Sequence, residues 1–347
     1  VIDCDVHNQF KNESELVPYL KEPWKSMVEK SGFRLSFTYG SPIGVLRKDA
    51  IPPNGGGPGS DPDFMSKQLI EAYNMEYVIL TSDGLIHIST LPDPDYAAAL
   101  ASAYNDYLVE TWLSKNKKFK GAMLIAAQDP YQAAREIDRI GQHPDIVEVM
   151  MSSSSASPYG QRFYHPIYEA AERNGLPVAI HPGAEGSGIT FAPTSAGYPT
   201  NYLQWHTCLS QNFMAQLVSI VCEGVFEKFP KLKFILCEGG VAWLPHLMWR
   251  LDKNYKALRS SAPWLKKMPS QYIRDHCYLT TQPIEEPENP KQLISIFDMI
   301  DAENILLFSS DYPHWDFDNP TKVLRGLSQE AKQKILYENA KELYGLK

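Results

Sequence analysis

The 347-residue sequence predicts one α/β domain, a (β/α)8 TIM barrel over residues 1–347. About eight short apolar runs recur along the chain, and helical patterns separate them. The runs are nearly continuous rather than alternating, as is typical of parallel strands covered on both faces. Strand–helix alternation favours a parallel α/β fold, and chains of this length often form one barrel. Eight repeats favour a closed barrel over an open sheet.

The elements follow one another in a regular order. The predicted strands lie at residues 1–6, 77–81, 119–126, 146–151, 177–181, 232–237, 276–280 and 304–309. The predicted helices lie at residues 65–74, 95–114, 130–140, 166–174, 211–229, 241–257, 290–300 and 328–344. Local signals support several of these ends. Asp129 followed by Pro130 is typical of a helix start, and Gly175 is typical of a helix end.

Two segments interrupt this order. Residues 8–63 form a long insertion after the first strand that is rich in Gly and Pro, and residues 183–202 follow the fifth strand. In a barrel both would lie on the C-terminal face, where substrate loops gather. For the first segment, a functional loop and a tolerated surface insertion remain equally open. For the second we favour a functional loop.

Metal-capable side chains stand where four predicted strands end. The first strand ends in Asp5-Val6-His7, and residues two apart in a strand point the same way. His181, Glu238 and Asp311 end the fifth, sixth and eighth strands. Each signal alone has a structural explanation, but charges at apolar strand ends are costly unless they are paired or coordinated. Two imidazoles and two or three carboxylates suit Zn, Mn, Fe or Co.

Further polar and aromatic residues follow these strand ends. His206, predicted near the start of a long helix, could be a proton donor, a substrate contact, a ligand of a second metal or a solvent-facing residue. His314 is expected to brace the loop or a ligand. Trp243, Tyr202 and Tyr312 are candidates for substrate binding, although aromatic clusters more often serve packing.

The order D-x-H, H-P-G, E-G-G and S-D-Y-P-H resembles the amidohydrolase superfamily. It is most similar to the branch of aminocarboxymuconate-semialdehyde decarboxylase and related aromatic acid decarboxylases. The resemblance runs from Ile2 to the closing ENAKELYG at residues 338–345, and SSDYPH is its most specific piece. It implies a barrel of the metal-dependent hydrolase type, with one divalent metal on four residues from three strand ends. These residues are Asp5, His7, His181 and Asp311.

The chain departs from that family pattern at two positions. Asp5 stands where the family usually has His, and Glu238 replaces the histidine of the sixth strand, which normally acts as acid/base or positions the substrate. Glu238 could therefore act as the acid/base, or it could bind metal and help to hold a second one. The resemblance implies Zn or Mn first, with Fe or a two-metal site as alternatives.

Three reactions fit this ligand set. The first is non-oxidative decarboxylation of a small aromatic or unsaturated carboxylic acid, with Asp311 or Glu238 protonating the carbon and His206 as a further candidate. The second is hydrolysis of an ester, lactone or amide by a metal-bound hydroxide. The third is oxygen chemistry at a dinuclear Fe or Mn site. A barrel that has lost catalysis would be expected to lack ligands, and none of the four is missing.

Composition limits the partners and the cellular location. The net charge is -8, and the sequence shows no basic stripe, so a nucleic-acid partner is not expected. No stretch approaches the roughly 18 apolar residues of a membrane span, and no signal peptide is evident. Five widely spaced cysteines without a C-x-x-C motif predict reduced thiols and a cytoplasmic enzyme. The expected partners are a small carboxylate or carbonyl substrate and, from the resemblance, a second copy in a homodimer or larger homo-oligomer.

Overall fold

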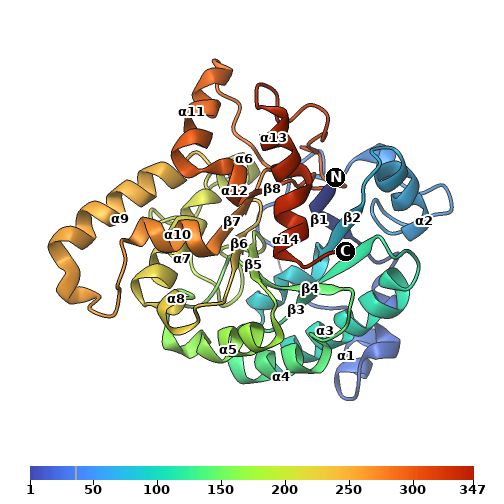
Figure 1. The fold of residues 1–347 in the computed structure, drawn as a ribbon. Coiled ribbons are helices and arrows are strands. Elements are labelled where there is room, and N and C mark those ends of the chain that lie inside the picture. The colour runs from blue at the N-terminus through green and yellow to red at the C-terminus, as the bar shows by residue number, and fades with distance from the viewer. Residues whose placement is uncertain (36) are drawn as a thin grey trace.

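The computed structural model, which describes residues 1–35 and 37–347, contains an eight-stranded parallel sheet at the centre of the molecule (Figure 1). Each strand pairs with its neighbours in the sequence, in the order β1 to β8. The strands are β1 (Ile2–Asn8), β2 (Tyr77–Ser82), β3 (Phe119–Leu124), β4 (Ile146–Ser152), β5 (Val178–His181), β6 (Phe234–Leu236), β7 (Cys277–Thr280) and β8 (Leu306–Leu307). All eight predicted strands are confirmed, and so is the barrel fold.

The barrel closes between β1 and the segment that follows β8. Cys4 N donates to Phe308 O at 2.9 Å, and Asp311 N donates to Asp5 O at 3.1 Å. His7 N donates to the carbonyl of Tyr312 at 2.7 Å. These hydrogen bonds lay the SSDYPH segment alongside β1. Closure of the barrel thereby brings together Asp5 and Asp311, the first and last of the predicted metal ligands.

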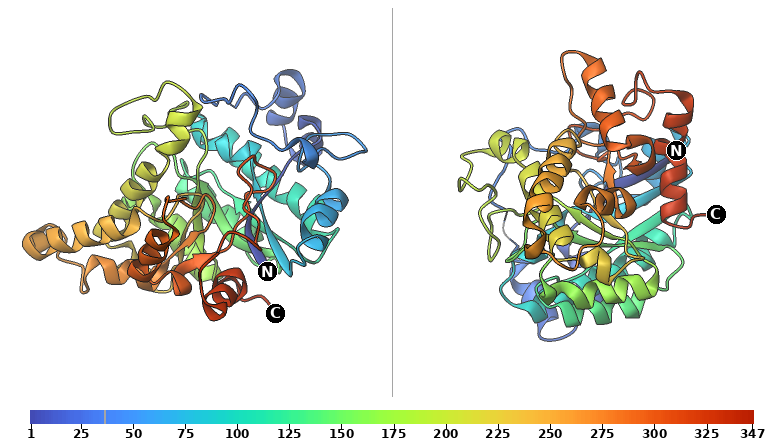
Figure 2. Two further views of the ribbon diagram at one scale, coloured as in Figure 1. Left: turned by 90° about the horizontal axis from the view of Figure 1, so that it is seen from above. Right: turned by 60° about the vertical axis from the view of Figure 1, so that its left-hand side comes forward.

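Helices surround the sheet in both further views of the molecule (Figure 2). Those that correspond to predictions are α2 (Pro62–Met65), α3 (Pro94–Tyr107), α4 (Pro130–Ile140), α5 (His165–Asn174), α7 (Ser210–Cys222), α9 (Leu244–Leu258), α11 (Pro290–Ile300), α13 (Gln329–Gln333) and α14 (Asn339–Leu343). Wider π-helical turns extend α2 and α3 and join α13 to α14. The α4 cap is as predicted, because Asp129 accepts from the amides of Tyr131 and Gln132.

The helical prediction was incomplete in the second half of the chain. The predicted helix 211–229 divides into α7 and α8 (Val225–Lys228) at Gly224, whose φ of 74° is left-handed. Among the described residues outside the insertion, three short α-helices were not predicted: α6 (Tyr202–Thr207), α10 (Pro269–His276) and α12 (Ala302–Ile305). His206 therefore lies on the short α6 and not at the start of a long helix.

The two irregular segments meet each other. The insertion after β1 contains α1 (Trp24–Ser31), and its later part reaches the loop after β5. Tyr39 stacks on Trp205 of α6 with 5.8 Å between ring centroids, and Phe37 forms an edge contact with the same indole at 5.4 Å. Thr38 and Ser187 share a hydrogen bond between their hydroxyl groups. Aromatic packing therefore ties the insertion to the helix that carries His206.

Two other expectations can be compared with the structure. All five cysteines are free, and Cys4, Cys237 and Cys277 are buried, as predicted. Within residues 1–35 and 37–347, no helix combines the length and the apolar character needed to cross a bilayer.

Candidate metal centre

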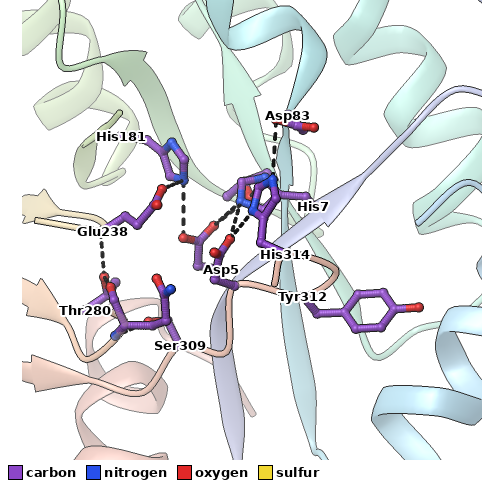
Figure 3. A network of polar contacts seen from close by, with 12 residues as sticks. Asp5, His7, Asp83, His181, Glu238, Thr280, Ser309, Tyr312 and His314 are labelled. Carbon is purple, nitrogen blue, oxygen red and sulfur yellow. Dashed lines mark hydrogen bonds and ion pairs between the residues drawn. The ribbon is translucent and has the colours of Figure 1, made fainter. Parts of the chain in front are cut away.

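Five side chains from four strand ends converge inside the mouth of the barrel. They form the acid–imidazole cluster: Asp5, His7, His181, Glu238 and Asp311. Figure 3 labels the first four of these residues. His181 Nε2 lies 3.3 Å from Asp5 Oδ2 and 3.1 Å from Glu238 Oε2. His7 Nε2 lies 3.6 Å from Asp5 Oδ1 and 2.9 Å from Asp311 Oδ1. Two ligand atoms on one cation are separated by about 3.0 to 3.5 Å when each bond is about 2.1 Å long, so this spacing suits a metal.

Hydrogen bonds orient both imidazoles of the cluster. His181 Nδ1 lies 2.7 Å from the carbonyl oxygen of Pro182, which accepts a hydrogen bond from Nδ1–H and leaves Nε2 facing the cluster. The Thr81 hydroxyl donates to Asp5 Oδ1 at 2.7 Å, and its oxygen lies 3.2 Å from His7 Nδ1. That oxygen can therefore accept from Nδ1, which leaves the Nε2 lone pair of His7 free. This outer support of each imidazole is typical of metal-ligating histidines.

Four buried atoms of the cluster have no hydrogen-bond partner among the described residues. They are Asp5 Oδ2, His7 Nε2, His181 Nε2 and Asp311 Oδ2. The His7–Asp311 contact is short, but its direction is not that of a hydrogen bond. Buried polar atoms are rarely left unsatisfied, because each costs about 1–3 kcal/mol. The donor set, its spacing and these open atoms together fit a divalent metal ion.

The cluster has strongly perturbed ionisation in the absence of a cation. Burial by itself would lower the pKa of His181, but Asp5 and Glu238 raise the pKa to about 10. Burial would raise the pKa of Asp5, yet His181 and His7 hold the pKa below its ordinary value. A metal would replace the proton on His181, because only the neutral imidazole can act as a ligand.

Two carboxylates of the cluster sit on left-handed backbone. Glu238 has φ 62° and Asp311 has φ 57°. Non-glycine residues rarely adopt this region, at a cost on the order of 1–3 kcal/mol each, and such residues gather at functional sites. The Glu238 amide donates to Thr280 Oγ1 at 2.8 Å, which fixes this turn to β7. The two left-handed residues carry the carboxylates of the cluster just beyond the ends of β6 and β8.

His314 braces Asp311, as the sequence predicted. His314 Nδ1 lies 2.5 Å from Asp311 Oδ1, and its Nε2 lies 3.9 Å from Asp83 Oδ1 (Figure 3). Burial would raise the pKa of Asp311, but the imidazoles of His314 and His7 hold it far below its ordinary value. The same contact keeps the pKa of His314 well above its ordinary value, against the effect of burial.

His206 approaches the cluster from outside the strands. Its Nε2 lies 3.8 Å from Glu238 Oε1 and 3.7 Å from Asp316 Oδ2. Three aromatic rings surround this imidazole: Tyr202 stacks on it at 5.5 Å, and Trp205 and Trp315 lie at 6.1 and 6.0 Å. The structure thus brings the predicted residues His206 and Tyr202 to the edge of the cluster.

Two predicted substrate contacts lie elsewhere. The phenol of Tyr312 points away from the cluster in Figure 3, and its hydroxyl donates to Gln68 Oε1 at 2.7 Å. Tyr312 is only 2% exposed, so this ring is held in the packing outside the cluster. Trp243 is half-buried, and its Nε1 donates to the carbonyls of Gly239 and Gly240 at 2.8 and 3.0 Å. Trp243 therefore braces the turn that carries Glu238.

Three residues at the site were not singled out from the sequence. Thr81 lies in the last pleat of β2 and Asp83 directly follows the strand, so the rule that polar residues at strand ends are informative would have found them. Asp316 lies in the SSDYPHWD segment, but no spacing rule separates it from an ordinary loop aspartate. Only the fold shows that Asp316 and Glu238 both face the imidazole of His206.

Two hollows of the molecule are lined by residues outside the cluster. One of about 500 Å³ and one of about 970 Å³ adjoin the loop after β4, and both are lined by Ser154 and Ser155. Neither is lined by a residue of the acid–imidazole cluster. The site is therefore identified by its cluster of metal-capable side chains and not by the size of a cavity.

Comparison with known families agrees with the geometry. The family model described as Amidohydrolase matches residues 2–346. The chain belongs to the amidohydrolase family. This amidohydrolase is 26% identical over 298 residues to gamma-resorcylate decarboxylase of a Polaromonas species, covering 80% of this chain and 86% of the relative. It is 23% identical over 263 residues to 2-amino-3-carboxymuconate-6-semialdehyde decarboxylase of Dictyostelium discoideum, covering 73% of this chain and 68% of the relative.

Solved structures share the fold of this amidohydrolase. A dihydroxybenzoic acid decarboxylase from a Polaromonas species, with bound manganese and the inhibitor 2-nitroresorcinol, matches with a TM-score of 0.69 at 20% identity. The match covers 99% of this chain and 96% of that one. A 5-carboxyvanillate decarboxylase from Novosphingobium aromaticivorans, complexed with manganese and 4-hydroxy-3-methoxy-5-nitrobenzoic acid, matches with a TM-score of 0.72 at 19% identity. That match covers 99% and 96% of the two chains. At this level of identity the likeness establishes the barrel fold.

Proposed function

We propose that this amidohydrolase is a divalent-metal-dependent decarboxylase that removes carbon dioxide from a small aromatic carboxylic acid without oxidation. The observation that carries the proposal is a set of unpartnered buried atoms at the barrel mouth. Asp5 Oδ2, His7 Nε2 and His181 Nε2 are open to a metal, and Asp311 Oδ2 is open to the substrate. The decarboxylases among its relatives support the reaction class, and the manganese in the related structures supports Mn²⁺ as the metal.

The residues that would hold the cation are Asp5, His7, His181 and Glu238, whose candidate ligand atoms all lie within 4.8 Å of one another. When bound there, a divalent ion supplies positive charge that orients the substrate carboxylate and a neighbouring oxygen and stabilises the charge that develops. The aromatic rings around His206 offer flat apolar surface for an aromatic substrate.

Asp311 is the group placed to deliver the proton. Its Oδ2 is buried without a partner, while its Oδ1 is held by His314 Nδ1. As the bond from ring carbon to carboxylate breaks, its electron pair stays on the ring carbon and takes a proton from Asp311 Oδ2. The overall change is ArCO₂⁻ + H⁺ to ArH + CO₂. The His314 imidazolium stabilises the resulting Asp311 carboxylate and holds the pKa of Asp311 far below its ordinary value, so the protonated fraction of Asp311 releases its proton readily.

His314 carries the proton of the Asp311–His314 pair. The other nitrogen of this imidazole, Nε2, faces Asp83 at 3.9 Å, and Asp83 itself accepts a hydrogen bond from Gln9. Asp83 and Asp311 hold the positive charge on His314, so the proton of this pair stays on the imidazole and Asp311 takes the proton it transfers from the medium before each turnover. Glu238 directs its two oxygens to two imidazoles and is assigned to binding and not to proton delivery.

The test is carbon dioxide release by metal-free protein reloaded with Mn²⁺ or Zn²⁺, measured on a panel of hydroxybenzoates and other aromatic acids. We expect release from at least one acid, and Asp311→Asn should slow it at least about 100-fold while metal stays bound. Asn tolerates the left-handed backbone at this position, so the variant should fold. The exposed helical variant His246→Ala is the matched control.

Two other outcomes would replace the proposal. Hydrolysis of esters, lactones or amides, without carbon dioxide release from any acid, would assign the same ligands to a hydrolase. Oxygen consumption with an iron-loaded protein would assign them to the oxidative reaction.

A further inference from the structure

Glu285 lies in the loop that follows β7, and its carboxylate holds the chain just beyond the turn that carries Glu238. Glu285 Oε1 accepts hydrogen bonds from the amides of Val241 and Ala242 at 3.0 and 2.9 Å. The Val241 amide also donates to Glu285 Oε2, at 3.1 Å. Hydrogen bonds to an ionised acceptor are shorter and stronger than those to a neutral one. The loop after β7 therefore fixes the backbone that leaves Glu238.

The two glycines after Glu238 allow other elements to approach the turn closely. A Cβ atom on Gly240 would lie 2.8 Å from Glu285 Oε1, and Gly240 has φ 67°, which is left-handed. A Cβ atom on Gly239 would lie 3.0 Å from the ring of Phe213 on α7. The Glu238-Gly239-Gly240 turn is thus packed between α7 and the loop that carries Glu285.

Contacts at both ends of this turn come from β7 and its loop. Thr280, the last residue of β7, accepts from the Glu238 amide at 2.8 Å, and Glu285 holds the amides that follow the turn. Glu238 itself is left-handed, with φ 62°. A non-glycine residue keeps this unfavourable backbone only where the surrounding structure holds it. The turn therefore depends on these outer contacts for its shape.

We propose that Glu285 is a positioning residue for the metal centre, because it holds the turn in the shape that directs the Glu238 carboxylate at His181. In that shape Glu238 Oε2 lies 3.1 Å from His181 Nε2. Loss of the amide contacts lets the turn relax and moves this oxygen away from the other ligands. The proposal rests on the metal centre of the proposed function, but it does not depend on which reaction the metal supports.

The test measures the Mn²⁺ affinity of metal-free protein by calorimetry and does not use activity. Glu285→Ala should weaken binding about 10- to 100-fold, as is typical when the support of a metal ligand is removed. Glu285→Asp keeps the charge, but its shorter side chain cannot reach both amides, so it should also weaken binding. Glu286→Ala removes a charge from the exposed neighbouring residue and should bind Mn²⁺ like the wild type. Wild-type affinity in both Glu285 variants would overturn the proposal.

A double-mutant cycle separates positioning of Glu238 from a general effect on the fold. If Glu285 acts through Glu238, then Glu285→Ala should change the affinity of Glu238→Ala protein by less than about twofold. An equal loss of affinity in the wild-type and Glu238→Ala backgrounds would overturn the positioning role. Circular dichroism checks folding, and Glu285→Asp takes the place of Glu285→Ala in the cycle if the alanine variant does not fold. Wild-type protein that binds no Mn²⁺ would overturn the metal centre itself, whereas wild-type binding that the Glu285 variants leave unchanged would overturn this proposal alone.

Discussion

Glu148 is a buried acid in the interior of the barrel, and its replacement gives a stability change whose size can be worked out. It lies on β4 with 1% exposure, and the Tyr344 hydroxyl donates to its Oε2 at 2.8 Å. Burial raises the pKa of Glu148 to about 8 from 4.5. The native protein therefore holds a proton on this group over a range of pH in which the unfolded chain has lost it.

The sign follows from proton uptake. Between about pH 4.5 and 8 the native state binds one more proton at Glu148 than the unfolded state, so stability falls as the pH rises. At about 1.36 kcal/mol per pKa unit, the shift amounts to roughly 5 kcal/mol at most. Glu148→Gln removes this dependence and keeps an oxygen that can accept from Tyr344. The variant should therefore gain stability relative to the wild type by about 1 kcal/mol per pH unit between pH 5 and 8.

The assay is urea unfolding of metal-free protein, followed by tryptophan fluorescence at pH 5, 6, 7, 8 and 9. The free-energy difference between Glu148→Gln and the wild type should rise to pH 8 and then level off. Glu169→Gln, at an exposed position of α5, is the control and should give a flat difference. A flat difference for Glu148→Gln as well would refute the reasoning, because the native carboxyl would then titrate like that of the unfolded chain.

Three further predictions concern the metal. His181→Ala should lose the metal and keep the fold by circular dichroism; metal at the occupancy of the wild type would remove His181 from the ligand set. Because the pKa of His181 is about 10, Mn²⁺ binding at pH 8 should release a proton, and the affinity should rise up to about tenfold per pH unit toward pH 10. Calorimetry in buffers of different ionisation enthalpy measures the released proton. A binding enthalpy that does not depend on the buffer would contradict this prediction. Thr81→Val removes the hydroxyl between Asp5 and His7 and should weaken Mn²⁺ binding about 10- to 100-fold; unchanged affinity would show that the hydroxyl does not orient the ligands.

The fold was predictable because its signals are local and repeated. Each strand is a short apolar run, and helix ends such as Asp129-Pro130 and Gly175 carry their own capping chemistry. The helix α10 was missed because its eight residues are too few to show a clear period. Its start nevertheless carries a signal, since Pro269 occupies the first turn and Gln271 accepts from the Met268 amide.

The inner site was predictable for a geometric reason. All the strands of a parallel barrel end at one rim, so polar residues at strand ends must approach one another. Asp5, His7, His181, Glu238 and Asp311 meet on that basis. The contacts of Asp316 and Tyr312 depend on how loops fold beyond the strands, and the sequence holds no rule for that. Tyr312 follows Asp311 directly, yet its ring packs in the opposite direction and bonds Gln68.

An anomalous difference map from crystals of the Mn²⁺-loaded protein tests the metal centre most directly. We predict a peak at the barrel mouth with Asp5 Oδ2, His7 Nε2, His181 Nε2 and Glu238 Oε2 each about 2.0–2.3 Å away. No peak there after saturating Mn²⁺, with those four atoms still in their present positions, would contradict the assignment of these residues as metal ligands.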